Sequence, residues 1–379
     1  MPSPQVIEVA RADDVRDVVH RAVQALAEGQ IVGLPTETVY GVAASATHPD
    51  AVERLAEAKG RPENAPFALA VKSAEDAEDY APGWSPVARR LARRCWPGPV
   101  TLVLDANQEE GLIGKLPETA LPYICPKGTV GLRSPANQVV QDILRMLAGP
   151  IALTSANASG EADATTAAGV VDALGDKVSL VLDDGPARYG QPSSVVRVTE
   201  TGFDILREGV VGRQTLERLS RYVVVFVCTG NTCRSPMAEA LMRRELAQRL
   251  GVPDDELESR GVMVASAGIA APQGSPASPE TAQLMREQGV PVDAHAAQQL
   301  TEHLVRQADL LVAMTPSHVE SILAHWPDAA SRVKLVDATG GTITDPIGCG
   351  IDVYRRCAEQ IARGVAHHAD AILAEIGAP

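Results

Sequence analysis

A thiol and a guanidinium lie close together in the stretch CTGNTCRS, residues 228–235. The apolar run before it, residues 222–227, predicts a buried strand, and the residues after it predict a helix. Backbone N–H groups at such a strand–loop–helix joint can converge on an anion. A thiol there experiences a positive potential, which favours the thiolate. The pattern Cys-x5-Arg-Ser therefore predicts cysteine-dependent phosphoryl transfer, and the alternative is a buried structural cysteine.

The predicted roles within this stretch follow from the residue types. Cys228 can attack phosphorus, and Arg234 can bind two phosphoryl oxygens. We expect Ser235 to be the N-cap of the helix and Pro236 to be its first residue. The other residues expected around the phosphate are Thr229, Gly230, Asn231, Thr232 and Cys233. Cys233 either forms a reversible disulfide with Cys228 or is a packed thiol.

A departing group needs a proton, so the site needs a general acid from elsewhere in the chain. Asp345 is the candidate, because it lies in a glycine-bearing loop before the last predicted helix, residues 350–375. An Asp-Pro pair is usually only a turn. Its position in the second half of the chain is what makes Asp345 a candidate acid.

Polar side chains also mark the ends of predicted elements in the first half of the chain. Lys59 and Arg61 lie between a predicted helix and a strand, and Arg133 lies at a strand end. Hydroxyl and amide side chains gather in the neighbouring turns and loops, and comprise Thr36, Tyr40, Thr154, Ser155, Asn157, Ser159, Ser193 and Ser194. Together they predict a site for a polyanion and a small polar ligand, although each one alone is typical of a solvated cation or a cap.

The elements that must position these residues alternate between strand and helix patterns, which predicts an α/β protein. In the first half, strands are predicted at residues 30–36, 67–72, 100–105, 129–134, 151–155 and 193–198, and helices at 16–30 and 50–60. From Tyr222 the pattern restarts as a doubly wound parallel sheet, with strands at 222–227, 262–266 and 309–313 and helices at 236–250, 278–289, 301–307, 316–324 and 350–375. We therefore predict domains over 1–212 and 222–379, joined by a linker at 213–221.

Composition places the chain among globular proteins. Hydrophobic residues make up 45% of the 379 residues, and no apolar run reaches the roughly 18 residues of a membrane-spanning helix. The N-terminus lacks a secretion-signal pattern, and the six cysteines form neither a disulfide framework nor paired CxxC zinc motifs. These features predict a cytoplasmic protein with no membrane partner.

The charge balance argues against a general nucleic-acid binder. The formal net charge is -14, and both halves are acidic: residues 1–218 carry 21 Lys+Arg against 29 Asp+Glu, and residues 219–379 carry 13 against 19. A local basic cleft is still compatible with this balance.

The second half resembles the low-molecular-weight protein tyrosine phosphatase family over residues 222–379, in the motifs VCTGNTCRSPMAEAL, SAGIAA, ADLLVAMTPSH and DPIGCGIDVYRRC. The resemblance implies that Cys228 is the nucleophile, that Arg234 binds the transition state, and that Asp345 is the acid and later the base for water. It also implies that Ser235 hydrogen-bonds the thiolate and that Asn231 shapes the loop. The expected partners are phosphorylated proteins, and no cofactor or metal is expected in this domain.

One loop position separates the branches of this family. Tyrosine-specific members usually have an aliphatic residue before the second loop cysteine, whereas this chain has Thr232, which resembles the protein-arginine phosphatase branch. The acid loop agrees in part, since Ile347, Gly348 and Cys349 replace the bulky aromatic residues of tyrosine-specific members; the arginine branch itself tends to an aromatic residue directly after the proline. We predict phosphoarginine as the favoured substrate, with phosphotyrosine, arsenate reduction or another phosphoester as alternatives.

The first half resembles the YrdC-like threonylcarbamoyl-AMP synthases over residues 14–210, in the motifs PTETVYG, KGRP, WPGPVTLVL, TSANASG, SSVVRV and ILREG. The resemblance implies a twisted open α/β sheet. It also implies that L-threonine, bicarbonate and ATP with Mg²⁺ give threonylcarbamoyl-AMP and pyrophosphate. That product serves the N6-threonylcarbamoyladenosine modification of tRNA, so proteins of this modification are expected partners.

The resemblance also suggests how the polar residues divide between the substrates. Lys59 and Arg61 would neutralise the triphosphate, and Thr36 and Tyr40 would line the threonine pocket. The other expected ligands are Arg133, Thr154, Ser155, Asn157, Ser193 and Arg207. The family usually has a lysine where this chain has Ala65, so one cation is missing. The alternative for the whole chain is a phosphotyrosine phosphatase joined to a non-catalytic module that binds RNA or nucleotide.

Overall fold

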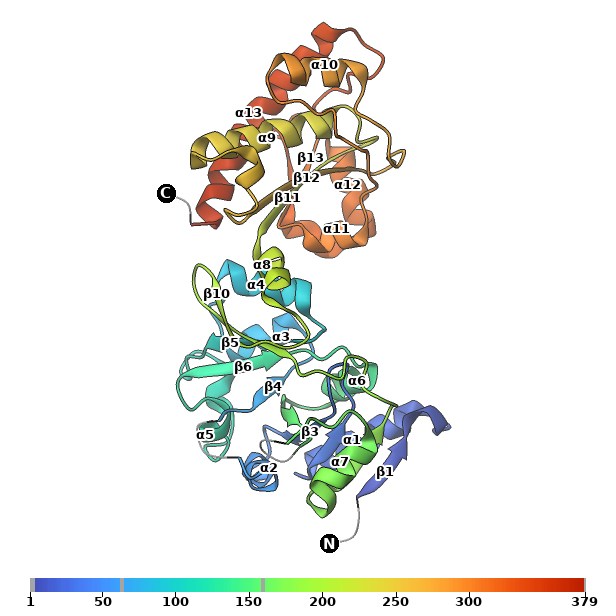
Figure 1. The fold of residues 1–379 in the computed structure, drawn as a ribbon, viewed down its shortest axis with the longest axis vertical. Coiled ribbons are helices and arrows are strands. Elements are labelled where there is room, and N and C mark those ends of the chain that lie inside the picture. The colour runs from blue at the N-terminus through green and yellow to red at the C-terminus, as the bar shows by residue number, and fades with distance from the viewer. Residues whose placement is uncertain (1–3, 62–64, 158–160, 378–379) are drawn as a thin grey trace. The chain divides into compact units, whose positions relative to one another are not determined.

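The computed structural model describes residues 4–61, 65–157 and 161–377. The chain forms two compact units, Met1–Glu217 and Arg218–Pro379, which we describe separately (Figure 1). Helix α8 (Arg213–Ser220) occupies the segment predicted as a linker. No helix in the described part of the chain combines the length and the apolar character that crossing a bilayer requires.

A mixed sheet of ten strands forms the first unit within the described residues, in the order β1-β8-β2-β3-β7-β4-β6-β5-β9-β10. Its strands are β1 (Gln5–Glu8), β2 (Val32–Leu34), β3 (Gly41–Ser45), β4 (Ala68–Ala70), β5 (Val100–Asp105), β6 (Thr129–Arg133), β7 (Ile151–Ser155), β8 (Leu180–Asp183), β9 (Ser194–Val198) and β10 (Phe203–Arg207). Strands β2, β3, β7 and β4 are successive antiparallel neighbours, whereas β4 and β6 are parallel, as are β5 and β9.

The helices of the first unit are α1 (Val15–Ala27), α2 (Ala51–Lys59), α3 (Ala74–Tyr80), α4 (Pro86–Cys95), α5 (Leu121–Ile124), α6 (Gln138–Met146) and α7 (Ala167–Leu174), with 3-10 turns η1 (Val9–Arg11), η2 (Leu112–Lys115) and η3 (Gly175–Lys177). Helix α1 shows why they form. The Asp14 side chain accepts a hydrogen bond from the Arg16 N–H at its start, and an apolar stripe that includes Val18, Ala22 and Leu26 enters the core beside α6.

A parallel sheet of four strands forms the second unit within the described residues, in the order β12-β11-β13-β14. Its strands are β11 (Tyr222–Cys228), β12 (Val262–Gly268), β13 (Leu310–Ala313) and β14 (Val333–Leu335). Its helices are α9 (Arg234–Leu250), α10 (Pro279–Glu287), α11 (Glu302–Gln307), α12 (Pro316–His325) and α13 (Ile351–Glu375), with 3-10 turns η4 (Asp254–Glu256) and η5 (Pro327–Arg332).

Strand β11 is buried on both faces, as a central parallel strand should be. Val224, Phe226 and Cys228 belong to the core that includes residues of α9, α10 and α13. Val223, Val225 and Val227 belong to the core on the other face, which includes residues of α11 and α12. Because the strand is held between β12 and β13, its last residue is delivered to a fixed point at the carboxyl edge of the sheet.

Candidate functional sites

The joint between β11 and α9 places Cys228 at the strand end and Arg234 at the helix start. The loop between them turns at Asn231, which has a left-handed backbone with φ of 53°. Strand β12 ends at Gly268, where a Cβ atom would lie 2.5 Å from the Thr229 carbonyl oxygen and 2.9 Å from the Asn231 nitrogen. The neighbouring strand therefore needs glycine there for the loop to close as it does.

The expectation that Ser235 caps α9 is wrong. The helix begins at Arg234 with Cys233 in the cap position, and no side chain caps it. The Ser235 hydroxyl lies 3.0 Å from the Cys228 sulfur, which is the contact that the family resemblance implied. Because the Cys233 side chain does not cap the helix, the first-turn N–H groups can be offered to an anion in the loop.

A hydrogen-bond network surrounds the Cys228 sulfur, which is buried. The Asn231 backbone N–H donates to the sulfur at 3.2 Å. The Asn231 amide nitrogen donates to the hydroxyls of Ser235 and Ser266, each at 2.9 Å, and its amide oxygen accepts from the Gln298 N–H at 2.8 Å. Polar groups from the loop and from the neighbouring segments thus fix both the Cys228 sulfur and the loop around it.

Arg234 and Asp345 form an ion pair across the mouth of the loop, although 111 positions separate them in sequence. The Arg234 side chain is 5% exposed and that of Asp345 is 42% exposed. Arg234 also donates to the Ile343 carbonyl at 3.2 Å, while its buried Nε atom has no hydrogen-bond partner among the described residues. An unsatisfied buried donor of this kind is costly unless a ligand completes it.

The other loop side chains have neighbours that the sequence did not indicate. The Thr232 hydroxyl lies 3.7 Å from the Cys233 sulfur, and that sulfur lies 3.5 Å from the Tyr354 hydroxyl. All six cysteines are free thiols in this structure. Thr229 contacts His318, which lies at the end of the motif ADLLVAMTPSH and for which no role was predicted.

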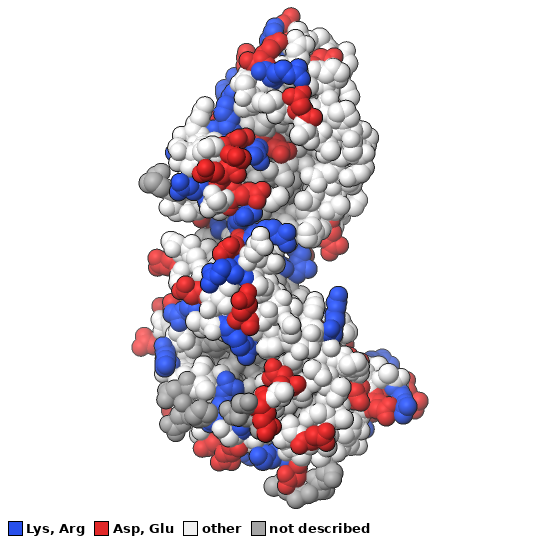
Figure 2. Space-filling model, in the orientation of Figure 1, with Lys and Arg blue, Asp and Glu red and all other residues white. Residues whose placement is uncertain are grey.

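A cleft of about 440 Å³ crosses the sheet of the first unit and contains most of the residues predicted there. Eight of the ten predicted ligands line it: Thr36, Tyr40, Arg61, Arg133, Thr154, Ser155, Ser193 and Arg207. Lys127 and Arg197 add two cations that the sequence analysis missed, and no Asp or Glu is among the described lining residues. Charges of both signs are interspersed on the face shown in Figure 2, so this one-sign lining is a local feature suited to an anion.

Arg61 and Arg207 are held against the wall of the cleft by neutral groups. Arg61 donates to the Thr154 hydroxyl at 2.7 Å and to the Ala65 carbonyl at 2.6 Å. Arg207 donates to the carbonyl of Ser193 at 2.8 Å. Burial lowers the pKa of both guanidinium groups, and neither forms an ion pair among the described residues. Their charges therefore remain available to a ligand.

Arg133, by contrast, is paired with an acid of the chain itself. Its Nη2 atom lies 2.7 Å from a Glu37 carboxylate oxygen, and the two side chains are 8% and 9% exposed. Nη2 also donates to the Thr38 hydroxyl at 3.0 Å, and Nε donates to the Gly98 carbonyl at 3.2 Å. Glu37 lies within the quoted PTETVYG motif, but nothing in the sequence pairs it with Arg133.

Thr36 and Tyr40 shape the wall through internal hydrogen bonds. The Thr36 hydroxyl donates to the Val39 carbonyl at 2.6 Å. Tyr40 is fully buried, donates to the Gly185 carbonyl at 2.6 Å, and has its pKa raised to about 12 by burial. Both hydroxyls are thus hydrogen-bonded within the protein, and these bonds fix the shape of the wall.

Lys59 and Asn157 do not line the cleft, but they form hydrogen bonds with the lining residue Ser155 and with each other. The buried Lys59 ammonium donates to the Ser155 carbonyl at 2.6 Å and to the Asn157 side-chain oxygen at 2.9 Å. The Asn157 side-chain oxygen also accepts from the Ser155 hydroxyl at 2.6 Å. The predicted Ser159 lies outside the described residues. Burial, together with the nearby Arg61, lowers the pKa of Lys59 to about 8.

The lowered pKa of Lys59 gives a pH-dependent prediction. Lys59 is charged below pH about 8 and loses its proton above it. As the pH rises, its hydrogen bonds to Ser155 and Asn157 therefore weaken and one positive charge beside the cleft is lost. We expect the ATP dissociation constant to increase about tenfold between pH about 7 and about 9. Calorimetric ATP titrations at these values check this, with Lys59→Met as the control. The same pH dependence in that variant would remove Lys59 from the explanation.

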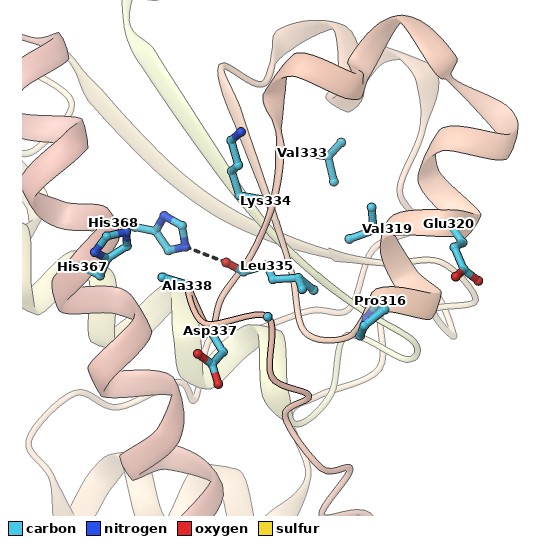
Figure 3. A pocket seen from close by; sticks show the side chains of 11 residues that line it. Pro316, Val319, Glu320, Val333, Lys334, Leu335, Asp337, Ala338, His367 and His368 are labelled. Atoms are coloured by element: carbon cyan, nitrogen blue, oxygen red, sulfur yellow. Dashed lines mark hydrogen bonds between the residues drawn. The ribbon is translucent and has the colours of Figure 1, made fainter.

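A further cavity of about 490 Å³ lies in the second unit between β14, α12 and α13 (Figure 3). Val319, Val333 and Pro316 form an apolar side, and Nε2 of His368 donates a hydrogen bond to the Leu335 carbonyl at 2.9 Å. None of its described lining residues is a predicted site residue. The candidate chemistry of this unit therefore lies at the β11–α9 joint.

Two family models match the chain, one in each unit. Residues 24–209 match the Sua5/YciO/YrdC family, which is described as Telomere recombination, and residues 223–377 match the family of Low molecular weight phosphotyrosine protein phosphatase. A putative threonylcarbamoyl-AMP synthase of Mycobacterium tuberculosis is 35% identical over 195 residues, covering 52% of this chain and 85% of that protein. A protein-arginine-phosphatase of Geobacillus stearothermophilus is 36% identical over 144 residues, covering 37% of this chain and 88% of that protein.

The chain belongs to both families. The joint at Cys228 lies in its phosphatase-family unit, and the cationic cleft lies in its synthase-family unit. The threonylcarbamoyl-AMP synthase of Pyrococcus abyssi is 36% identical over 194 residues, covering 51% of this chain. The chain spans about half the length of that relative, 54%. A solved structure of Sua5 from the same organism has a TM-score of 0.51 at 22% identity, covering 96% of this chain and 97% of that chain, and supports the α/β fold.

Proposed function

We propose that the chain is a bifunctional enzyme. Its first unit would form threonylcarbamoyl-AMP from L-threonine, bicarbonate and ATP. Its second unit would dephosphorylate phosphoproteins, with phosphoarginine favoured, through a cysteinyl-phosphate intermediate. Free thiols throughout suit the cytoplasmic location predicted from the sequence. Proteins of tRNA modification that consume threonylcarbamoyl-AMP are the proposed partners of the first unit.

The synthase proposal rests on the cleft, where five cationic side chains converge without a carboxylate among the described lining residues. Arg61 and Arg207 would bind phosphate oxygens, since neither has an acidic partner among these residues. Lys59 and Asn157 would hold the wall that carries Ser155, and Thr154 and Ser193 would offer hydroxyls to the nucleotide. The reaction needs no covalent enzyme intermediate, so positioning and charge neutralisation would supply the rate enhancement.

The threonine side of the cleft is proposed to lie near Thr36, Tyr40 and Arg133. The Arg133 Nη2 and Nε atoms are engaged by the protein, so Nη1 is the atom left for the substrate carboxylate. Glu37 would keep the guanidinium plane in a fixed orientation. Such a fixed orientation suits recognition of a planar carboxylate.

Mg²⁺ is proposed to enter with ATP and not through a protein site. The described residues contain no cluster of three or more His, Cys, Asp or Glu side chains suited to a metal, and the cleft lining has no acid. Phosphate oxygens and water are the usual ligands of Mg²⁺ in nucleotide sites. The ion would neutralise part of the triphosphate charge. This chain has Ala65 where the family usually has a lysine, so that residue cannot contribute a positive charge.

The test of the synthase proposal is pyrophosphate release. Purified protein with ATP and Mg²⁺ should release pyrophosphate only when L-threonine and bicarbonate are both present. Pyrophosphate release that does not depend on L-threonine, or the absence of any release, would contradict the synthase proposal and favour a nucleotide-binding module.

The phosphatase proposal rests on the joint, where Cys228 lies against hydrogen-bond donors and the buried Arg234 Nε lacks a partner among the described residues. An incoming phosphoryl group would supply the missing acceptor and displace Asp345 from Arg234. Cys228 would then form the S–P bond while the P–N bond breaks, and Asp345 would protonate the leaving guanidine nitrogen. Water activated by Asp345 would release phosphate from the sulfur.

Phosphoarginine is favoured by Thr232 and by the similarity to the protein-arginine-phosphatase of Geobacillus stearothermophilus. We expect Thr232→Ile to lower the ratio of kcat/KM for phosphoarginine to that for phosphotyrosine by roughly tenfold, because a hydroxyl near the polar leaving group is replaced by an apolar group. Peptides of one sequence carrying either phosphoresidue give this ratio directly. Thr232→Ser is the matched control, and an unchanged ratio in Thr232→Ile would remove Thr232 from the explanation.

A further inference from the structure

The residue directly after the nucleophile is held by a buried histidine. The Thr229 hydroxyl lies 3.0 Å from Nε2 of His318, in the first turn of α12. Nδ1 of His318 lies 2.8 Å from the hydroxyl of Thr315, the N-cap of the same helix. His318 is 6% exposed, whereas Thr229 is exposed. Thr229 is therefore an exposed residue directly after Cys228, and a buried partner fixes the position of its hydroxyl.

The ring of His318 is neutral at working pH. Burial and the positive charge of Arg234 lower its pKa to about 4, and Asp345 acts in the opposite direction. The charges of both Arg234 and Asp345 thus reach His318. Helix α12, which carries His318, is therefore within the electrostatic influence of the phosphatase site. Among the described hydrogen bonds, it contacts the loop directly only through His318 and Thr229.

The tautomer of His318 does not change what Thr229 can offer to a substrate. A neutral imidazole has one donor nitrogen and one acceptor nitrogen. If Nε2 donates, the Thr229 oxygen keeps one lone pair and its own proton. If Nε2 accepts that proton, the oxygen keeps both lone pairs. In either arrangement the hydroxyl can accept one more hydrogen bond from a group that enters above Cys228.

We propose that Thr229 is a specificity-determining residue that accepts a hydrogen bond from a guanidinium N–H of phosphoarginine, and that His318 is its positioning residue. The inference rests on the proposed phosphatase function and deepens it. A guanidinium carries only donors, so an acceptor at the mouth is its natural partner. A phosphorylated phenol has no N–H to offer, and its ring would remove water from the hydroxyl without replacing the hydrogen bond.

This role is separate from that of Thr232. The contact of Thr232 that the structure gives is with the Cys233 sulfur, and its backbone oxygen accepts from the Ser278 N–H at 2.8 Å. Thr229 instead belongs to a fixed chain of polar groups that runs from Thr315 through His318. Two threonines at the two ends of one loop would then act together in selecting the phosphorylated side chain.

Thr229→Val tests the proposal, because it removes the hydroxyl and keeps the shape. The readout is the ratio of kcat/KM for phosphoarginine to that for phosphotyrosine, in peptides of one sequence. We expect this ratio to fall roughly tenfold or more, the effect of losing a hydrogen bond to a charged group. Thr229→Ser should restore it. An unchanged ratio in Thr229→Val overturns the proposal.

His318 variants test the positioning role. His318→Leu should lower the same ratio mainly through a higher KM for phosphoarginine, and His318→Gln should recover part of it because its amide can hydrogen-bond the hydroxyl. Ser321→Ala, which removes a hydroxyl farther along α12, is the matched control and should leave the ratio unchanged. A shift in kcat alone for both substrates would assign His318 a merely structural role and overturn this part.

The outcomes also separate this inference from the proposed function. A wild-type protein that hydrolyses neither peptide overturns both. A wild type that prefers phosphotyrosine overturns the phosphoarginine preference, while a further fall of the ratio in Thr229→Val would still support the role of Thr229. If His318→Leu does not fold, Thr229→Val decides alone.

Discussion

Cys228→Ser is expected to lower phosphatase turnover by at least about a thousandfold while inorganic phosphate still binds. The serine hydroxyl is a far weaker nucleophile than a thiolate, and the hydrogen-bond partners of the Cys228 sulfur among the described residues, the Ser235 hydroxyl and the Asn231 N–H, include no base to activate it. The anion site should survive, because it is built from backbone N–H groups and the Arg234 guanidinium. Steady-state assays on a phosphoarginine peptide give the turnover, and calorimetry gives the affinity for phosphate.

Two comparisons make this result specific. Cys349→Ser replaces an exposed thiol in the same unit and should leave turnover within about twofold. Arg234→Leu, unlike Cys228→Ser, should abolish the affinity for phosphate in addition to turnover, because it removes the guanidinium. Wild-type turnover in Cys228→Ser would mean that another residue is the nucleophile.

Arg133→Leu is expected to lower the free energy of unfolding of the first unit by about 3–5 kcal/mol. The substitution leaves the Glu37 carboxylate buried without its partner, in a pair whose side chains are 8% and 9% exposed. Threonine-dependent pyrophosphate release should be lost even where the variant is folded, because the proposed carboxylate ligand is gone. Urea unfolding followed by the fluorescence of Trp84 and Trp96 measures the stability of this unit.

Arg197→Leu is the matched control for this prediction. Arg197 also lines the cleft and forms an ion pair, but its partner Asp105 is 81% exposed, so water can replace the lost contact. We expect a loss of at most about 1 kcal/mol. The double replacement Arg133→Leu/Glu37→Leu should recover part of the stability, since it leaves no unpaired charge. Equal losses for Arg133→Leu and Arg197→Leu would contradict the argument from burial.

The local sequence pattern was sufficient to predict the secondary structure of segments that are long and buried. The apolar run 222–227 predicted the strand that the structure has as Tyr222–Cys228, and the helical pattern at 350–375 predicted Ile351–Glu375. Strands β1, β3, β8, β10 and β14 were not predicted. They have three to five residues each, and although β2 and β4 are as short, those two lie within longer apolar runs; the unpredicted strands depend more on their pairing partners than on their own propensity.

The chemistry of the joint was also local, because one strand end, one loop and one helix start supply nearly all of it. The sequence alone therefore predicted the phosphate loop, Cys228 as its nucleophile, and three of the five cationic residues that line the cleft of the first unit. The contact of Ser235 with the Cys228 sulfur was expected from the family resemblance, but the local pattern wrongly made Ser235 the cap of α9, because the helix start depends on how the loop closes against Gly268.

Contacts between distant segments were decided only by the tertiary structure. Glu37 and Arg133 lie 96 positions apart, and Thr229 and His318 lie 89 apart. Strand register and helix packing bring each pair together, and neither leaves a periodic signal in the sequence. The sequence by itself determined which reactive groups the protein carries. The fold decided which of them are already paired, because a buried charge or hydroxyl must find its partner inside the protein when water cannot reach it.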